Sequence, residues 1–428
     1  MHSRILILAL ALLATATAAS PPAAVQAILA RGPLPSPGQK VRAVHVGVLV
    51  QDLSTDERLI DVRANESFQP ASNTKLATAA ALLYALGPRV QLETRLLARG
   101  ADTGVTRLTL VGSGDPTFTS SGPNSLASLA RQVADAGVLE VGDLVIDDSL
   151  LARPWLLPDN GELVSAVRVG DLRPSSGAEP FTPSAPQRYA SAVGEALRAA
   201  LEDAGVRVTS AARQGQAAPD DTVIASVRSA PLSEVLARTL KPSDNAAAEH
   251  LLALTGVSEK GASVTPAQAR ASVAAFLDRA GVDRAGISLV DGSGLSRNDR
   301  LTPNAVVQLL RFAYRTPLLA PGETLTPLEA FKTHRNPFVE ALAVGGTGTA
   351  TSQAAANGGT LATRFVNAGL DVRAKTGTIV GASALSGYVV AKSGRVLAFS
   401  LLMDGYGGFG SELRAFQDEL VKAIAGAY

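Results

Sequence analysis

Cysteine is absent from the chain of 428 residues, and aromatic residues make up only 4% of it. Without cysteine the protein has no disulfide, no thiolate zinc site, no iron–sulfur cluster and no cysteine nucleophile. Positive charge is not in excess either, because 39 Lys and Arg residues are balanced by 38 Asp and Glu residues. The sequence therefore lacks the basic character typical of nucleic-acid-binding proteins, and we expect no nucleic-acid partner.

Lysine and histidine are also scarce, with 8 lysines against 31 arginines and only 4 histidines. Scattered histidines in a chain without cysteine argue against a catalytic zinc site, and we expect no metal or other cofactor. Hydrophobic residues, by contrast, are plentiful at 46%. This content excludes a disordered chain, and the length is typical of two or three globular domains.

The N-terminus has the pattern of a secretory signal peptide. Arg4 precedes an unbroken apolar run at residues 5–13, and Ala16-Thr17-Ala18 fits the small-residue pattern of a cleavage site. The apolar run is too short to span a bilayer. We predict a signal peptide at residues 1–19, whose removal takes Arg4 away and leaves 38 basic and 38 acidic residues. The mature protein is then expected to be exported to the periplasm or cell envelope, with no integral membrane segment.

Two β-hairpin patterns, one near each end of the mature chain, predict a single antiparallel sheet. The first pattern covers residues 43–51 and 59–62, and the second covers residues 386–392 and 396–404. Helical patterns flank both hairpins. A sheet that takes strands from both ends of the chain encloses the middle of the chain as an insertion.

The middle of the chain has its own pattern of short strands, such as residues 107–111 and 144–147, interspersed with helices. We therefore predict a main domain from residues 20–89 and 226–428, and a smaller inserted domain at residues 90–225. The predicted fold class is α/β (α+β), with a central antiparallel sheet flanked by helices.

Ser72 and Lys75 form an S-x-x-K pair at the start of a predicted helix. Residues three apart lie on one helical face, with Cβ atoms about 5–6 Å apart, so Lys75 Nζ can reach Ser72 Oγ. A neutral lysine can take the proton of a serine hydroxyl, but deprotonating it at pH 7 costs about 4.6 kcal/mol, which burial must offset. Serine at a helix start is commonly only an N-cap. Here, however, no other lysine has a serine three residues before it.

Two further motifs carry polar groups suited to a binding cleft. Ser243-Asp244-Asn245 lies between two predicted helices, where a loop can present a hydroxyl and an amide. Lys375-Thr376-Gly377-Thr378 lies just before the C-terminal hairpin, where an edge strand would offer backbone N–H groups and Gly377 would allow close approach. Taken alone, the first is typical of a capping cluster and the second of an ordinary strand.

S-x-x-K, S-D-N and K-T-G in this order form a strong constellation. With it, the chain resembles the penicillin-recognising serine acyl-transferases, and more narrowly the D-alanyl-D-alanine carboxypeptidase/endopeptidase family of low-molecular-mass penicillin-binding proteins (peptidase S13 type). Three segments add to the narrower resemblance: Pro70-Ala71-Ser72, Gly114-Asp115-Pro116 and Asp291-Gly292-Ser293-Gly294-Leu295-Ser296-Arg297. Ser72 and Ser243 are 171 residues apart, which agrees with the family's insertion. The resemblance implies a β-lactamase/transpeptidase-like domain with an inserted domain.

The resemblance also implies roles for the first two motifs. Ser72 would be the acylated nucleophile, and Lys75 would be its base. Ser243 would relay a proton to the leaving amine, while Asn245 would hydrogen-bond the substrate amide and Lys75.

For the third motif the resemblance implies substrate binding. Lys375 would supply positive potential, Gly377 would allow close approach, and Thr376 and Thr378 would bind the terminal carboxylate of the substrate. The backbone N–H groups of Ser72 and Thr378 would form an oxyanion hole, and such donors are typically worth about 10²–10³ in kcat.

The implied activity is hydrolysis of D-Ala-D-Ala in peptidoglycan stem peptides, with β-lactams as covalent inhibitors. A serine β-lactamase and a non-catalytic cell-wall-binding scaffold are the alternatives. Class A β-lactamases use a glutamate-held water, and no glutamate between Ser72 and Ser243 stands in an E-x-x-L-N context. A Ser-His-Asp hydrolase is disfavoured, because only His45, His250 and His334 follow the signal segment and G-x-S-x-G is absent.

Overall fold

The computed structural model describes residues 20–33, 44–101, 104–152, 155, 163–172, 185–257, 263–405 and 410–428. The predicted signal peptide at residues 1–19 lies outside the described residues. Within the described part of the chain, no helix combines the length and the apolar character needed to cross a bilayer.

One sheet takes its strands from both ends of the chain. These are β1 (His45–Asp52), β2 (Arg58–Val62), β9 (Ala343–Val344), β10 (Val372–Ile379), β11 (Ala382–Val390) and β12 (Val396–Asp404). Their order is β2-β1-β12-β11-β10-β9, and neighbouring strands run antiparallel. β1 lies beside β12, with His45 opposite Asp404. This pairing confirms the expected sheet, although β11 begins at Ala382 and so starts earlier than the predicted strand.

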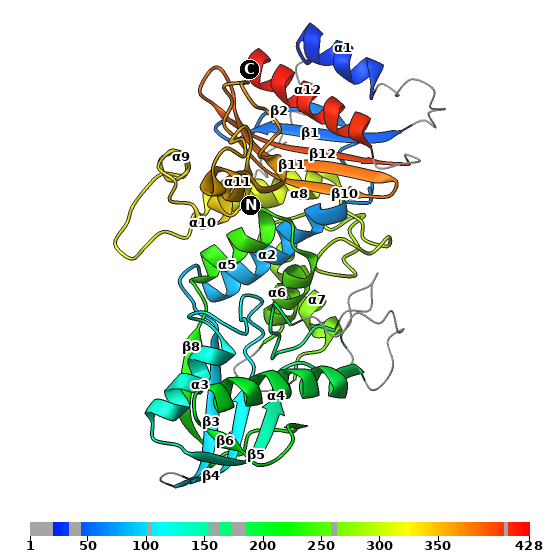
Figure 1. Ribbon diagram of the computed structural model, residues 1–428. Helices are drawn as coiled ribbons and strands as arrows, with labels where there is room; N and C mark the ends of the chain where they lie inside the picture. The colour runs from blue at the N-terminus through cyan, green and yellow to red at the C-terminus, as the bar shows by residue number, and fades with distance from the viewer. Residues whose placement is uncertain are drawn as a thin grey trace, which may run out of the picture.

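The sheet is buried on both faces, as the composition of β12 indicates. Its side chains alternate between two clusters: Leu397 and Phe399 face one, and Ala398 and Leu402 face the other. The first face is covered by α1 (Ala23–Arg31) and α12 (Ser411–Ala427), and the second by α8 (Pro303–Arg315) (Figure 1). A strand between two layers of helices needs apolar residues throughout, which explains its almost continuous apolar run.

Helix α2 (Thr74–Leu86) lies at the centre of the second face. Every residue from Thr74 to Leu83 is buried, because the helix is apolar around its whole circumference and rich in alanine. Around it pack α5 (Leu232–Leu240), α6 (Asn245–Thr255) and α7 (Pro266–Arg279) (Figure 1). The shorter helical elements are η1 (Ala71–Asn73), α9 (Pro327–Lys332), α10 (Pro337–Glu340), α11 (Ser352–Gly358) and η2 (Gly359–Leu361).

A second sheet, with its own core, forms from the middle of the chain and lies at the opposite end of the molecule (Figure 1). Its strands are β3 (Glu93–Ala101), β4 (Gly104–Val111), β5 (Glu140–Asp147), β6 (Arg207–Val208), β7 (Arg213–Gln214) and β8 (Thr222–Arg228). The order is β6-β5-β4-β3-β8, and β7 also pairs with β5. Two helices pack on this sheet, α3 (Leu126–Asp135) and α4 (Ala185–Asp203). The predicted fold class is confirmed; the boundaries at residues 89/90 and 225/226 stay a prediction.

Buried His250 on α6 ties the main helices to residues 163–172. The Ser165 N–H donates to His250 Nε2 (3.2 Å), so His250 Nδ1 must carry the proton that bonds the Ala246 carbonyl (2.7 Å). Burial, and then the charge of Arg168, lower the pKa of His250 to about 3. The ring is therefore neutral, and both of its nitrogens are hydrogen-bonded.

Because the pKa of His250 is lower in the folded protein than its usual value of about 6.5, only the unfolded chain gains a proton there between pH 6.5 and pH 3. Its contribution to stability is complete above pH 6.5 and is lost as the pH falls. Between pH 8 and pH 5, we expect the unfolding free energy of the wild type to fall by about 2 kcal/mol more than that of His250→Gln. Urea denaturation of both proteins at the two pH values measures this difference, and equal losses would contradict it.

Candidate active site

Ser72 stands in the tight turn η1, immediately before α2, and its side chain is partly exposed. The preceding residue, Ala71, has a φ of +46°, a left-handed conformation that costs a non-glycine residue about 1–2 kcal/mol. Packing holds the turn in place. A Cβ at Gly294 would overlap the Ala71 carbonyl, and one at Gly377 would lie 2.8 Å from the Pro70 carbonyl oxygen. The strained turn is therefore clamped between two glycines.

The amine of Lys75 has three oxygen partners. Nζ lies 3.0 Å from Ser72 Oγ, 2.7 Å from Asn245 Oδ1 and 2.6 Å from the Ser293 carbonyl oxygen. An ammonium group satisfies all three with its three hydrogens. A neutral amine has two hydrogens, and the amide and carbonyl oxygens can only accept them. Its lone pair then faces the one partner that can donate, the hydroxyl of Ser72.

Burial lowers the pKa of Lys75 to about 8, although the carboxylates of Glu249, Asp291, Asp244 and Asp299 oppose the shift, in that order. Only 1% of the Lys75 surface is exposed. With this pKa about one lysine in ten is neutral at pH 7, compared with fewer than one in a thousand for an exposed lysine. Burial therefore offsets most of the free energy that deprotonating Lys75 at pH 7 would otherwise cost.

Ser243 and Lys375 form a second hydroxyl–amine pair. Ser243 joins α5 to α6 with a φ of +66°, and its neighbour Asp244 turns away to cap α6 by accepting from the Ala247 N–H (2.9 Å). Lys375 Nζ lies 2.8 Å from Ser243 Oγ and 2.8 Å from the Thr376 carbonyl oxygen. Complete burial, and then the charge of Lys75, lower the pKa of Lys375 well below its usual value.

The strand that carries Lys375 is open on one side where the third motif begins. β9 pairs only with Arg373 and Ala374, so β10 is an edge strand from Lys375 onward, as expected. Thr376 Oγ1 hydrogen-bonds Thr360 Oγ1 (2.7 Å), and Thr378 is exposed. No described strand pairs with this edge beyond Ala374, so an extended ligand can lie along it.

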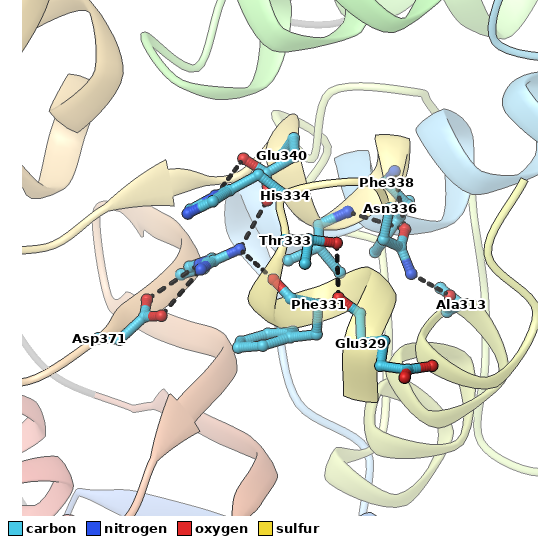
Figure 2. A network of polar contacts seen from close by, with 11 residues as sticks. Ala313, Glu329, Phe331, Thr333, His334, Asn336, Phe338, Glu340 and Asp371 are labelled. Carbon is cyan, nitrogen blue, oxygen red and sulfur yellow. Dashed lines mark hydrogen bonds and ion pairs between the residues drawn. The ribbon is translucent and has the colours of Figure 1, made fainter. Parts of the chain in front are cut away.

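Arg373 fixes the start of β10, on the same face of the strand as Lys375. Its guanidinium group donates twice to Asp371 and once to Glu340 (2.6 Å), and stacks over the Phe331 ring at 4.3 Å (Figure 2). Only 5% of its side chain is exposed. This charged group is paired with two carboxylates, whereas the amine of Lys375 bonds a hydroxyl and a carbonyl oxygen.

The eight sequence-predicted site residues lie on η1, on α2, at the junction of α5 and α6, and on β10, but several groups of the site were missed. The Asn73 amide donates to the Lys375 carbonyl (3.0 Å) and ties η1 to β10. The Ser293 carbonyl bonds Lys75, although residues 291–297 entered the sequence analysis only as a characteristic loop. Glu249 and Asp299 were also missed; an acidic residue inside the apolar run of α6 was the available signal for Glu249.

Among the described residues, no group of three or more His, Asp or Glu side chains has an arrangement that could hold a metal ion. The site instead offers two hydroxyls, two buried amines and an amide. Lys75 is hydrogen-bonded to Ser72 and Asn245, and Lys375 is hydrogen-bonded to Ser243.

Known structures show which fold the protein has. The chain superimposes on penicillin binding protein 4 (dacB) from Haemophilus influenzae with a TM-score of 0.71, at 20% identity, over 94% of this chain and 98% of that one. That protein has also been solved in complex with a β-lactam, and this form matches with a TM-score of 0.66. The fold is that of a penicillin-binding protein.

Sequence comparison narrows the class to one family. The model of the D-Ala-D-Ala carboxypeptidase 3 (S13) family matches residues 37–162 and 174–425. A D-alanyl-D-alanine carboxypeptidase from Actinomadura sp. (strain R39) is 31% identical over 85% of this chain and 78% of its own length. Carboxypeptidase DacB from Mycolicibacterium smegmatis is 30% identical over 84% and 76%. The chain belongs to the S13 family of serine-type D-Ala-D-Ala carboxypeptidases.

The clamp on η1 predicts the effect of a single methyl group. We expect Gly294→Ala to push Ala71 away, and so to lower the rate of serine acylation at least tenfold and the unfolding free energy by more than about 2 kcal/mol. Gly281→Ala is the matched control, because Gly281 also has a positive φ but would have nothing within 4 Å of its Cβ. Equal losses of stability and unchanged acylation in both variants would show that the turn is not clamped.

Proposed function

We propose that Ser72 is the nucleophile of a two-step acyl transfer and that Lys75 is its base. The observation that carries the proposal is the geometry at Lys75 Nζ, where two pure acceptors leave the lone pair of the neutral amine facing the Ser72 hydroxyl (3.0 Å). A serine activated in this way can attack a carbonyl carbon without a histidine.

In the first step Ser72 Oγ bonds to the carbonyl carbon of the penultimate D-Ala, and its proton passes to Lys75. The bond to the leaving nitrogen then breaks. Ser243, held by Lys375 at 2.8 Å, gives its proton to that nitrogen and takes up the proton that Lys75 received, so that D-Ala leaves and Lys75 is neutral again. Asn245 holds Lys75 and hydrogen-bonds the substrate amide. In the second step water hydrolyses the ester and frees Ser72.

The open edge of β10 binds the substrate in this proposal. Thr376 and Thr378 bind the terminal carboxylate, and Gly377 allows the backbone to approach. Backbone N–H groups of Ser72 and Thr378 stabilise the oxyanion. The arriving carboxylate favours the charged form of Lys375, which burial disfavours in the free enzyme, so the positive potential develops when substrate is bound.

The substrates we propose are peptidoglycan stem peptides, with β-lactams as covalent inhibitors that acylate Ser72. The relative from Actinomadura is a D-alanyl-D-alanine carboxypeptidase, and a β-lactam complex is known for the Haemophilus influenzae protein. The signal-peptide pattern at residues 1–19 supports export to the periplasm or cell envelope, where these peptides occur. The main domain, residues 20–89 and 226–428, carries this chemistry, and residues 90–225 form the inserted domain.

Labelled penicillin tests the nucleophile. We expect the wild-type protein to take up one label per chain and to keep it for long times, because no glutamate between Ser72 and Ser243 stands in the E-x-x-L-N context of class A β-lactamases. Ser72→Ala should abolish labelling and the release of D-Ala from a pentapeptide ending in D-Ala-D-Ala. Mass spectrometry follows both reactions.

Three other results of that experiment would overturn parts of the proposal. Rapid turnover of penicillin would indicate a β-lactamase. A folded protein that takes up no penicillin and releases no D-Ala would indicate a binding scaffold. Products from intact peptidoglycan, compared with those from free pentapeptide, separate endopeptidase from carboxypeptidase action.

The pKa of Lys75 predicts the pH dependence of acylation. Since the base must be neutral and its pKa is about 8, the second-order rate constant should rise about tenfold per pH unit below pH 8 and level off above it. Stopped-flow measurement with a chromogenic β-lactam between pH 5.5 and 9.5 gives the profile. Lys75→Arg, whose side chain keeps its proton, should be inactive throughout. A flat wild-type profile would contradict the role of Lys75.

A further inference from the structure

Three carboxyl groups lie beneath Lys75, outside the motifs that the reaction uses. Glu249 is on α6, four residues after Asn245, while Asp291 and Asp299 belong to the loop that follows α7. Their exposed fractions are 1%, 4% and 0%. Burying three acidic groups together is costly, so their placement calls for a specific role.

Two of these carboxylates hold the loop that bonds Lys75. Glu249 accepts from the N–H groups of Gly292 (3.0 Å) and Ser293 (2.8 Å). Asp291 accepts from the N–H groups of Ser293 (3.1 Å) and Gly294 (2.6 Å). The two carboxylates thus hold the N–H groups of Ser293 and Gly294. The Ser293 carbonyl lies between these N–H groups and accepts from Lys75 Nζ.

We propose that Glu249, together with Asp291, is a positioning residue for the base: it holds the Ser293 carbonyl against Lys75 Nζ, and its charge sets the pH at which Lys75 becomes neutral. This inference rests on the proposed role of Lys75. It assigns to the carboxylates an effect on the base, in addition to their hydrogen bonds within the loop.

The charges around the two buried amines are unequal. Lys75 faces the carboxyl groups of Glu249, Asp291, Asp244 and Asp299, and it also faces the amine of Lys375. Lys375 bonds a hydroxyl and a carbonyl oxygen instead. When the two amines share one proton, the carboxylates therefore hold that proton on Lys75, beside the serine, and leave Lys375 neutral.

The carboxyl groups also share a proton among themselves. Burial, and then the charge of Asp291 and a hydrogen bond to it, raise the pKa of Asp299 to about 9. A protonated Asp299 donates to Asp291, which accounts for the lack of any donor to Asp299 Oδ2 among the described residues. Burial and Asp291 raise the pKa of Glu249 to about 7. Above neutral pH Glu249 thus carries a charge.

Glu249→Gln separates the two effects of the side chain. Glutamine keeps an oxygen that accepts from Gly292 and Ser293, but it removes the charge. We expect the midpoint of the acylation profile to move down by roughly one pH unit, so that the rate at pH 7.5, where Glu249 of the wild type carries its charge, rises about threefold above that of the wild type. A purely structural role for Glu249 predicts the opposite, a uniform loss of rate with an unchanged midpoint, and that result would overturn the proposal.

Asp52→Asn is the matched control. Asp52 is also fully buried, and it too accepts from a backbone N–H, that of Ser54 (2.8 Å), but it lies on β1 and is not among the charges that act on Lys75. Its loss should lower stability and leave the midpoint near pH 8. A shifted midpoint in this variant would show that the profile follows stability, which overturns the proposal.

If Glu249→Gln does not fold, Asp291→Asn removes the neighbouring carboxylate that also acts on Lys75, with the same direction of shift expected and the same contradicting result.

The activity of the wild type distinguishes a failure of the proposed function from a failure of the role given to Glu249. A wild-type protein that neither labels with penicillin nor releases D-Ala refutes the proposed function. An active wild type whose folded charge variants keep the wild-type midpoint refutes only the role given to Glu249.

Discussion

The burial of one lysine amine is the constraint on which the arrangement of the site depends. An amine with 1% exposure needs every hydrogen placed, and Lys75 finds its acceptors in η1, α6 and the loop after α7. These three segments are distant in sequence, so the tertiary fold must bring them together before any of them can act. The apolar surface of α2 makes this possible, because most of the side chains that the helix buries on all its sides carry no polar group.

The helices bury Lys75, and the sheet holds the turn that carries Ser72. β10 brings Lys375 and the open edge against η1, and Gly377 lets the two backbones approach. η1 in turn keeps a left-handed residue that it would not adopt alone, since packing on both sides outweighs the roughly 1–2 kcal/mol of strain. The packing that holds the strained turn thus also places the Ser72 hydroxyl 3.0 Å from Lys75 Nζ.

Local signals in the sequence were sufficient for the strands, α2 and the three motifs. Hairpins and helices have a periodicity that is visible in a single chain, and side chains such as Ser72 and Lys375 have recognisable chemistry. The missed groups act differently. The Ser293 carbonyl is a backbone atom that every residue has, the positive φ of Ala71 follows from packing, and Glu249 acts on a lysine 174 positions earlier in the sequence. Tertiary placement decides these features, and residue type alone does not reveal them.

A comparison of Arg373 with Lys375 in β10 shows how a buried arginine and a buried lysine differ in this chain. Arg373 and Lys375 lie two residues apart on one face of the strand, and both are buried. Arg373 meets carboxylates from Asp371 and Glu340 and an aromatic ring, surroundings that suit a permanent cation. Lys375 meets a hydroxyl and a carbonyl, and it can be buried there because an amine, unlike a guanidinium group, can give up its proton. A chain that otherwise prefers arginine thus keeps lysine at the two positions where the charge must be able to disappear.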